Sequence, residues 1–283
     1  ARTVAPGVQV ISLETAEGKA GVIAGGSLAL AIDAGVDPVE GATIREAATV
    51  FGRPAMALLL THGHYDHALG SPAFRGDRIV ANEAVAPHMR SQLDAWAQRW
   101  STTPAEVDGL LGWPTETFAG DLELELGGRT VRLIDSPGHA PGSVCVLDLE
   151  HGVLYGGDTV VTAIPPDFWD GDGRVLAATL RRLQALDAET LVPGHGAVVQ
   201  GRAAVSEAID WSASYLERCA ALVDAHASED ADAIIVAAPY DDYIGDRLRR
   251  DRMRMPWRHE RTIRKLVALR DQRPDAGTQT RHV

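Results

Sequence analysis

The sequence predicts an α/β protein in which two β-rich blocks, each followed by helices, form a sandwich of sheets flanked by helices. Three observations carry this prediction. The chain has 283 residues, of which 45% are apolar and 23% charged, so it can bury the core of one large domain with an appendage. Short apolar or alternating runs, typical of strands, occur before residue 82 and again between residues 121 and 192. From residue 201 the pattern is helical nearly to the end, which predicts a C-terminal helical extension.

The first block begins with strands and ends with helices. Its expected strands are residues 8–13, 21–24, 28–33, 55–60 and 78–81. Its expected helices are residues 37–51, 83–100 and 104–111. The pair Gly25-Gly26 is a hairpin turn signal between two of the strands, and Asp37-Pro38 is a helix start signal. The six consecutive apolar residues at 55–60 are typical of a buried strand.

The second block has the same character and leads into the extension. Its expected strands are residues 121–126, 130–134, 144–149, 153–155 and 190–192. Its expected helices, together with those of the extension, are residues 173–186, 202–227 and 257–269. Strict alternation along 121–126 and the turn at Gly127-Gly128 indicate a hairpin. Pro256 stands just before the last helix, where its fixed backbone angle suits a helix start.

Composition and charge restrict the class of function. Thirty-nine acidic and 27 basic residues give a net charge of −12, and residues 1–200 carry all of it, with 25 acids and 13 bases. An acidic body argues against nucleic acid as a partner. No apolar run approaches the roughly 20 residues of a membrane span, so we expect a cytoplasmic protein without membrane contact. The two cysteines, Cys145 and Cys219, are too few for a disulfide scaffold or a thiolate metal site.

Metal-binding residue types gather at the ends of predicted strands. Four of them follow the strand 55–60 within six residues: His62, His64, Asp66 and His67. Three more stand beside glycine in turns that each follow a predicted strand: His139, Asp158 and His195. Alone, each of these three is more often an ordinary turn residue. Imidazole and carboxylate at this density suit a divalent transition metal, and strand ends would present them to one cleft.

These motifs resemble those of a known family. The segment His62-Gly63-His64-Tyr65-Asp66-His67 is similar to the HxHxDH signature of the metallo-β-lactamase-fold hydrolases. The turns around the other three candidates resemble the remaining ligand motifs of the family, in the same chain order, and the resemblance covers roughly residues 8–200. It implies a four-layer αβ/βα sandwich with metals at one edge between the two sheets. We therefore expect a catalytic domain at residues 1–200 and a helical extension at residues 201–283, packed on it.

The resemblance also implies a role for each candidate. The first metal would be held by His62, His64 and His139, the second by Asp66, His67 and His195, and Asp158 would bridge them. We expect two divalent ions, with Zn²⁺ favoured over Fe or Mn. The implied chemistry is attack of a metal-bound hydroxide on the carbonyl of an ester, lactone or thioester, with Asp66 orienting the nucleophile and relaying its proton. The substrate would be a small molecule.

Other functions within this fold remain as alternatives. A mononuclear iron dioxygenase of persulfides would use His62, His139 and Asp158 alone. A β-lactam amide hydrolase would break a different bond, although the bridging carboxylate resembles the glyoxalase II, lactonase and thioesterase branches more closely. Quorum-lactonase relatives carry a tyrosine shortly after this carboxylate, where the chain has Val160 and Val161.

Two segments are candidates for the walls of the cleft. Residues 83–113 hold three of the six tryptophans, Trp96, Trp100 and Trp113, either as helices packed on the sandwich or as an aromatic lid. Residues 163–169 follow Asp158 closely and would have to pass near the cleft. Weaker candidates lie in the extension: Tyr240, Tyr243 and Arg247.

The extension itself carries an apolar stripe that needs burial. Ile263, Leu266, Val267 and Arg270 are spaced at i, i+3, i+4 and i+7, and the arginine at the end of the stripe can extend its charge to solvent. We expect the extension to wall the cleft or to form a subunit contact, so a homo-oligomer is an open alternative.

Overall fold

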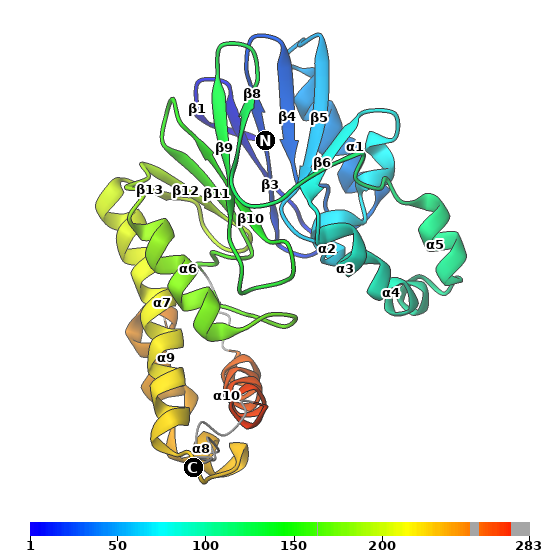
Figure 1. Ribbon diagram of the computed structural model, residues 1–283. Helices are drawn as coiled ribbons and strands as arrows, with labels where there is room; N and C mark the ends of the chain where they lie inside the picture. The colour runs from blue at the N-terminus through cyan, green and yellow to red at the C-terminus, as the bar shows by residue number, and fades with distance from the viewer. Residues whose placement is uncertain (163, 250–254, 273–283) are drawn as a thin grey trace, which may run out of the picture.

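The computed structural model describes residues 1–162, 164–249 and 255–272, without the side chains of residues 245–249, and contains two facing sheets (Figure 1). The first sheet has the order β1-β2-β3-β4-β5-β6-β7 and the second the order β13-β12-β11-β10-β9-β8. The strands of the first sheet are β1 (Arg2–Ala5), β2 (Val8–Ser12), β3 (Lys19–Ala24), β4 (Leu28–Ile32), β5 (Ala55–Leu60), β6 (Arg78–Asn82) and β7 (Glu116–Phe118). The strands of the second are β8 (Leu122–Glu125), β9 (Thr130–Asp135), β10 (Val144–Asp148), β11 (Val153–Gly157), β12 (Thr190–Pro193) and β13 (Val199–Gln200).

Helices cover the outer face of each sheet. Those beside the first sheet are α1 (Pro38–Thr49), α2 (Tyr65–Ala68), the 3₁₀ turn η1 (Ser71–Phe74), α3 (Val85–Ser91), α4 (Leu93–Trp100) and α5 (Pro104–Leu110). Helices α6 (Gly173–Gln184) and α7 (Arg202–Ala225) lie side by side on the second sheet. The chain continues through α8 (Ala231–Ala237), α9 (Tyr240–Arg249) and α10 (Pro256–Asp271).

The apolar core has three layers, as a four-layer sandwich requires. One layer fills the space between the sheets, where Leu30 and Leu59 face Leu133 and Val146. A second lies between the first sheet and its helices, and a third lies between the second sheet, α6 and the helices of the extension, α7 to α10. The αβ/βα sandwich predicted from the sequence is therefore confirmed.

Strand direction places five strand ends at one edge of the sandwich. Strands β4 and β5 are parallel, and so are β11 and β12. Strand β10 is antiparallel to both β9 and β11, so β9 runs in the same direction as β11. The carboxyl ends of parallel strands meet at one edge of a sheet. The loops that follow β4, β5, β9, β11 and β12 therefore lie at one edge of the sandwich.

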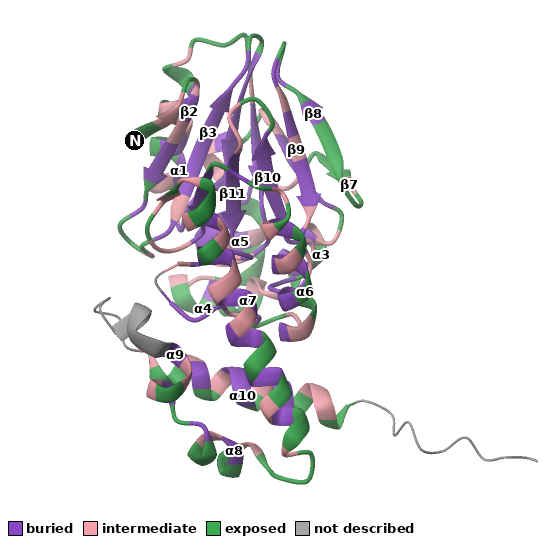
Figure 2. Ribbon diagram, turned by 90° about the vertical axis from the view of Figure 1, so that its left-hand side faces the viewer, coloured by how far each residue is buried: buried purple, intermediate pink, exposed green. Residues whose placement is uncertain are grey.

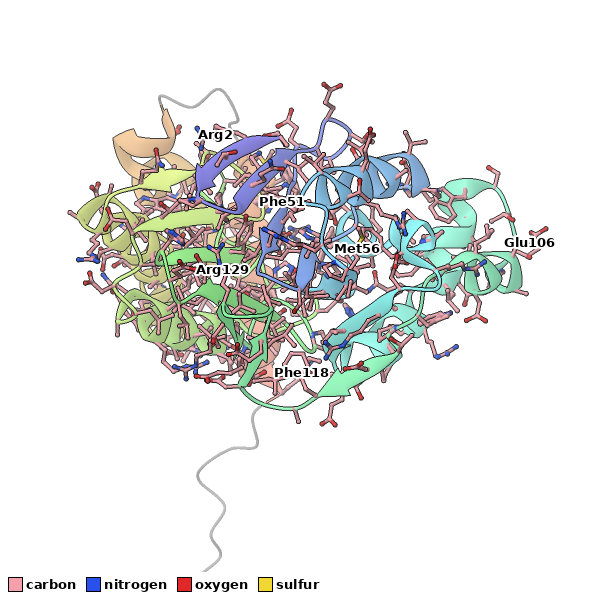
Figure 3. All side chains as sticks on the ribbon, turned by 90° about the horizontal axis from the view of Figure 1, so that it is seen from above. Arg2, Phe51, Met56, Glu106, Phe118 and Arg129 are labelled. Carbon is pink, nitrogen blue, oxygen red and sulfur yellow. The ribbon has the colours of Figure 1, made fainter. Side chains whose placement is uncertain are left out.

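The opposite edge is closed by a buried ion pair. Arg129 stands between β8 and β9, and its guanidinium binds both carboxylate oxygens of Asp148, at 2.8 and 2.7 Å. The same group donates to the backbone carbonyls of Pro6 and Ala24 in the first sheet. Viewed from above, Arg129 lies near the middle of the molecule, whereas Glu106 of α5 projects from its periphery (Figure 3). The pair therefore ties the two sheets together.

Several element predictions need correction. The single helical region expected at 83–100 is two helices, because the backbone turns at Gln92 between α3 and α4. Strands β1, β7 and β13 were not expected, since they are short and partly exposed and carry little apolar pattern. Figure 2 shows the contrast between the buried central strands and the exposed β7 and β8. The predicted core position of Cys145 is confirmed, because its side chain is fully buried in β10.

The last helix buries the stripe predicted for it. Ile263, Leu266 and Val267 are buried in α10, which contacts α7 and α8. The guanidinium of Arg270 ends the stripe by donating to the backbone carbonyls of His226 and Glu229. None of the helices within the described residues combines the length and the apolar character of a membrane-spanning segment.

Candidate metal centre

The loop after β5 is built to present four side chains at once. Strand β5 ends at Leu60, and the next residue, Thr61, donates its backbone N–H and its hydroxyl to the two carboxylate oxygens of Asp33, at 2.8 and 2.9 Å. One turn of helix, α2, then follows with His64 at its N-cap. This turn carries Asp66 and His67, and the His67 ring packs against that of His62, with 4.2 Å between the ring centroids. The motif is thus anchored to a rigid strand.

Three histidines from two loops face one another. His62 Nε2 lies 3.1 Å from His64 Nδ1, and His139 Nε2, from the loop after β9, lies 3.0 Å from the same atom. Ligand nitrogens on a tetrahedral zinc ion, at 2.0–2.1 Å from the metal, would lie about 3.3 Å apart. These three residues and Asp158 each offer one ligand atom, and the four atoms lie within 4.8 Å of one another. We call His62, His64 and His139 the histidine-rich group.

The outer nitrogens of these rings determine which inner nitrogens are free. His62 Nδ1 lies 3.1 Å from the Thr61 hydroxyl, which already donates its proton to Asp33 and therefore accepts here. His64 Nε2 donates to Asp170 at 2.9 Å, and His139 Nδ1 donates to the backbone carbonyl of Asp167 at 2.8 Å. In neutral rings the three inner nitrogens therefore carry lone pairs that converge on one point, which suits a shared cation.

The second group has more carboxylate. His67 Nδ1 donates to Asp33 at 2.8 Å, and its Nε2 lies 3.2 Å from Asp158 Oδ1. His195, from the loop after β12, places Nε2 3.3 Å from Asp66 and 3.4 Å from Asp158. The ligand atoms of these four residues also lie within 4.8 Å of one another. We call Asp66, His67 and His195 the carboxylate-rich group, which shares Asp158 with the histidine-rich group.

Unpartnered atoms provide an independent test of whether metals fit. Among the described residues, three buried side-chain nitrogen or oxygen atoms lack a hydrogen-bond partner, and two of them are His67 Nε2 and Asp158 Oδ1. A buried polar atom without a partner is costly, and these two lie 3.2 Å from each other, within the second group of ligand atoms. The same atoms are the ones that a metal would bind, so the residues present fit two divalent ions.

Electrostatics differ between the two groups. Burial and neighbouring histidines hold the pKa of His62 well below its usual range, and burial and His64 lower the pKa of His139 to about 4. In contrast, Asp158 raises the pKa of His195 to about 10. Burial opposes ionisation of Asp158, but His195 and His67 outweigh it and keep the pKa of this carboxyl well below normal. The carboxylate-rich group therefore favours a protonated His195, whereas the histidine-rich group favours neutral rings at His62 and His139.

Glycine is required where the loops meet. A Cβ on Gly194, the residue before His195, would collide with Oδ1 of Asp158 and with the backbone of Gly157. The backbone N–H of Gly194 donates to the Gly157 carbonyl at 2.8 Å. The Pro-Gly-His sequence thus allows His195 to approach the shared carboxylate.

A cavity of about 810 Å³ opens over this centre. The ligands that line it include His64, Asp66, His139, Asp158 and His195. Its apolar and aromatic wall comprises Val161, Ile164, Trp169, Met255 and Trp257. Glu17, Lys19, Arg258 and Arg261 add charge. A cavity of this size can hold a small-molecule substrate.

The walls differ partly from expectation. Residues 83–113 contribute Gln92 to the cavity, but Trp96 is buried in the core beneath the first sheet, and Trp100 and Trp113 pack against that core. Packing, not an aromatic lid, is therefore their role. The segment 163–169 does form a wall, through Ile164, Asp167 and Trp169, while Ala163 lies outside the described residues.

Two of the three candidates in the extension do not reach the cavity. Tyr240 is buried with the core of α7 and α10, and Tyr243 packs against that core, so neither lines the cavity. The side chain of Arg247 lies outside the described residues. The cavity is instead reached by Trp257, Arg258 and Arg261, on the first turns of α10.

Sequence reasoning also missed the residues that hold the ligands. Asp33 had a recognisable sequence signal, because it is an acid at the end of an apolar predicted strand. In the structure it is buried and has a positive φ of 62°. Asp170 and its second partner His88, whose Nε2 lies 3.1 Å from Asp170 Oδ2, had none, because they approach the site from distant segments.

The arrangement of these seven side chains at one edge of an αβ/βα sandwich agrees with sequence comparison. The model of the metallo-beta-lactamase superfamily matches residues 17–195, which include all seven. The chain belongs to the metallo-beta-lactamase superfamily. Its members include metal-dependent hydrolases, and a dinuclear zinc centre is typical of them.

Curated relatives within this superfamily match the catalytic part of the chain. A hydroxyacylglutathione hydrolase from Acidiphilium cryptum is 32% identical over 160 residues, which cover 56% of either chain. An acyl-coenzyme A thioesterase, MBLAC2, from Gallus gallus is 28% identical over 163 residues, covering 50% of this chain and 57% of the relative. The chain thus spans a little over half the length of these relatives.

Solved structures show the same superfamily fold at low identity. A metallo-beta-lactamase family protein from Thermus thermophilus has a TM-score of 0.62 at 20% identity, covering 78% of this chain and 83% of that one. The sec-alkylsulfatase Pisa1 from Pseudomonas sp. has a TM-score of 0.71 at 15% identity. It covers 94% of this chain, and this chain covers 49% of it. At that coverage, most of the helical extension also has a structural counterpart.

Proposed function

We propose that this superfamily member is a dinuclear metal-dependent hydrolase that cleaves a thioester or a related ester or lactone bond. The observation that carries the proposal is the sharing of Asp158 by two groups of ligand atoms, each compact enough to hold one ion. A carboxylate that belongs to both groups brings two ions close together, as in two-metal hydrolytic sites.

The chain's own residues would have distinct tasks in this reaction. His62, His64 and His139 would hold the first ion, Asp66, His67 and His195 the second, and Asp158 both. Bound divalent ions supply an activated water and polarise the carbonyl of the substrate. The carboxylate of Asp66 lines the cavity, so it can orient the attacking water and accept its proton. The apolar wall around Trp169 and Trp257 would hold the acyl chain.

Relatives favour a thioester within this class. Two of them, a hydroxyacylglutathione hydrolase and an acyl-coenzyme A thioesterase, are named for hydrolysis of a thioester bond. The cavity of about 810 Å³ is large enough for an acyl group with part of its thiol leaving group. Zinc is the ion favoured by histidine and carboxylate ligands without thiolate, with iron or manganese as alternatives.

One experiment tests the proposal against its alternatives. Purified protein would be analysed for metals and then assayed with matched thioester, ester, lactone and β-lactam substrates. We expect two divalent ions per chain and the highest turnover with a thioester. One iron per chain with persulfide-dependent oxygen consumption would contradict the proposal and support the dioxygenase. Turnover of the β-lactam alone would support an amide hydrolase.

A further inference from the structure

One short loop holds two of the three histidines in the histidine-rich group. This loop, residues 167–170, begins with Asp167, whose backbone carbonyl accepts the proton of His139 Nδ1 at 2.8 Å. It ends with Asp170, whose carboxylate accepts from His64 Nε2 at 2.9 Å. Both contacts are made to the nitrogens that face away from the metal position. The 167–170 loop therefore sets the orientation of both rings.

Side chains of α10, the last described helix of the chain, contact this loop. The Asp167 carboxylate pairs with Arg258 at 3.2 Å and with Arg261, both on α10. The Arg261 guanidinium also lies over the Trp169 ring, 3.6 Å from its centroid, and Lys265 donates to the Trp169 carbonyl at 2.8 Å. In Figure 1, α10 lies just beneath the loops at this edge of the sandwich. Three cations of one helix thus converge on two residues of the loop.

The loop has a second anchor on the sandwich side. The backbone N–H of Asp172 donates to the Gly138 carbonyl at 3.0 Å, where helix α6 begins. This contact holds the end near Asp170. The end near Asp167 has α10 against its carboxylate, so we expect His139 to depend on α10 more than His64 does.

The carboxylate-rich group is held differently. His67 donates to Asp33, which the sandwich positions at the end of β4. The backbone carbonyl of His195 accepts from Thr162, and Gly18 pairs with His195 as an isolated bridge. Among the described residues, these contacts lead to the end of β4 and to neighbouring loops rather than to α10.

We propose that helix α10 is a positioning element for the first metal ion, acting through the 167–170 loop on His139 and His64. This inference rests on the metal assignment of the proposed function. The ion at the histidine-rich group should bind more weakly when the contacts of α10 with the 167–170 loop are removed. The affinity for the other ion should stay the same. Residues that orient metal-binding histidines contribute about 10–100-fold to metal affinity, which sets the expected size of the effect.

The test separates the two ions by using variants that keep one group at a time. His195→Ala leaves the histidine-rich group, and His62→Ala leaves the carboxylate-rich group. The paired substitution Arg258→Gln and Arg261→Gln is then made in each background, and Zn²⁺ affinity is measured by competition with a chromophoric chelator. We expect about a 10–100-fold loss in the first background and less than a threefold change in the second.

A matched control lies on the same helix. Arg264 pairs with Asp232 of α8, is 52% exposed and does not line the cavity. Arg264→Gln removes the same charge from α10 without touching the 167–170 loop, so it should leave both affinities unchanged. The paired substitution Arg258→Lys and Arg261→Lys keeps two positive charges beside the Asp167 carboxylate, so it should restore part of the lost Zn²⁺ affinity.

A second variant guards against a general loss of folding. Asp170→Ala removes the acceptor of His64 while α10 stays docked, and Asp170→Asn keeps an oxygen that can accept the same proton. The alanine variant should weaken Co²⁺ binding and alter its visible absorption spectrum in the histidine-rich background, and the asparagine variant should restore both.

The outcomes distinguish this inference from the proposed function. Equal losses of affinity in both backgrounds, or no loss in either, would overturn a specific role for α10. If the wild-type protein binds two ions but hydrolyses none of the substrates, the proposed function fails while the affinity comparison still decides this inference.

Discussion

The two metal groups share one carboxylate yet differ in what holds them. In the carboxylate-rich group, Asp33 orients His67 from inside the sandwich, and Asp158 raises the pKa of His195 to about 10. In the histidine-rich group, the outer nitrogens of His64 and His139 contact the 167–170 loop, outside the central strands.

This difference shows that ligands from one short motif can be held in place by different parts of the molecule. The HxHxDH segment supplies ligands to both groups, but the second group is supported from the core of the sandwich, through Asp33 at the end of β4. The first reaches beyond that core to a loop that contacts the C-terminal helix α10. We therefore expect substitutions to separate the two ions, and the following predictions are ordered by the size of the expected effect.

Replacing the shared carboxylate should weaken metal binding at both groups. Asp158→Ala removes a ligand atom from each group, so both ions should bind weakly and activity should fall by about a thousandfold or more, because several kcal/mol of metal-dependent stabilisation are lost. Metal content per chain and turnover are measured together. Retention of two ions with near-normal turnover would show that Asp158 bridges nothing.

Replacing Asp66 should affect one group only. Asp66→Ala takes a carboxylate from His195 and from the cavity but leaves the histidine-rich group intact. We expect the protein to retain one ion tightly and to lose about a hundredfold in turnover, within the range of a general base. Metal titration by calorimetry, with Asp66→Asn as the isosteric control, gives the stoichiometry. Loss of both ions together would contradict separate sites.

The pH dependence of metal binding should also separate the groups. In the metal-free protein the pKa of His195 is raised to about 10, so a metal must displace its proton at lower pH. Burial opposes protonation of His67, but Asp158 and Asp33 outweigh it and raise the pKa of this residue as well, so affinity at the carboxylate-rich group should rise by at least about tenfold per pH unit between about 7 and 10. Burial and His64 lower the pKa of His139 to about 4, so the other group should change little over this range.

Zinc titrations from pH 7 to 9 in the His62→Ala and His195→Ala backgrounds provide the measurement. Matching pH slopes in the two backgrounds would show that the electrostatic contrast between the groups is absent in solution.

The far edge of the sandwich should affect neither group selectively. Arg129→Ala takes the guanidinium away from the fully buried Asp148, whose carboxylate keeps only its contacts with His151 among those described, and should destabilise the fold by about 3–5 kcal/mol. The ratio of the two zinc affinities should stay unchanged, because the pair lies at the opposite end of the strands. Chemical denaturation and zinc competition test this, and a selective loss of either ion would show coupling across the sheets.

Much of the fold was predictable because its signals are local. The apolar run in β5, the glycine pair before β4 and the buried stripe of α10 each depend on residues within one turn or one strand. The short exposed strands β7 and β13 were not predictable, since pairing with a neighbour and not their own pattern makes them strands. The break at Gln92 is likewise a matter of how α3 and α4 pack on the first sheet.

The sequence by itself determined which side chains gather at the centre, because strand-end turns with glycine or proline mark each candidate and one family motif joins them. Only the tertiary structure decided which nitrogen of His64, His67 and His139 faces the metal position. That choice depends on Asp33, Asp167 and Asp170, which reach their histidines across 28 to 106 residues of chain. Hydrogen bonds act over about 3 Å of space regardless of sequence separation, so no local pattern records them.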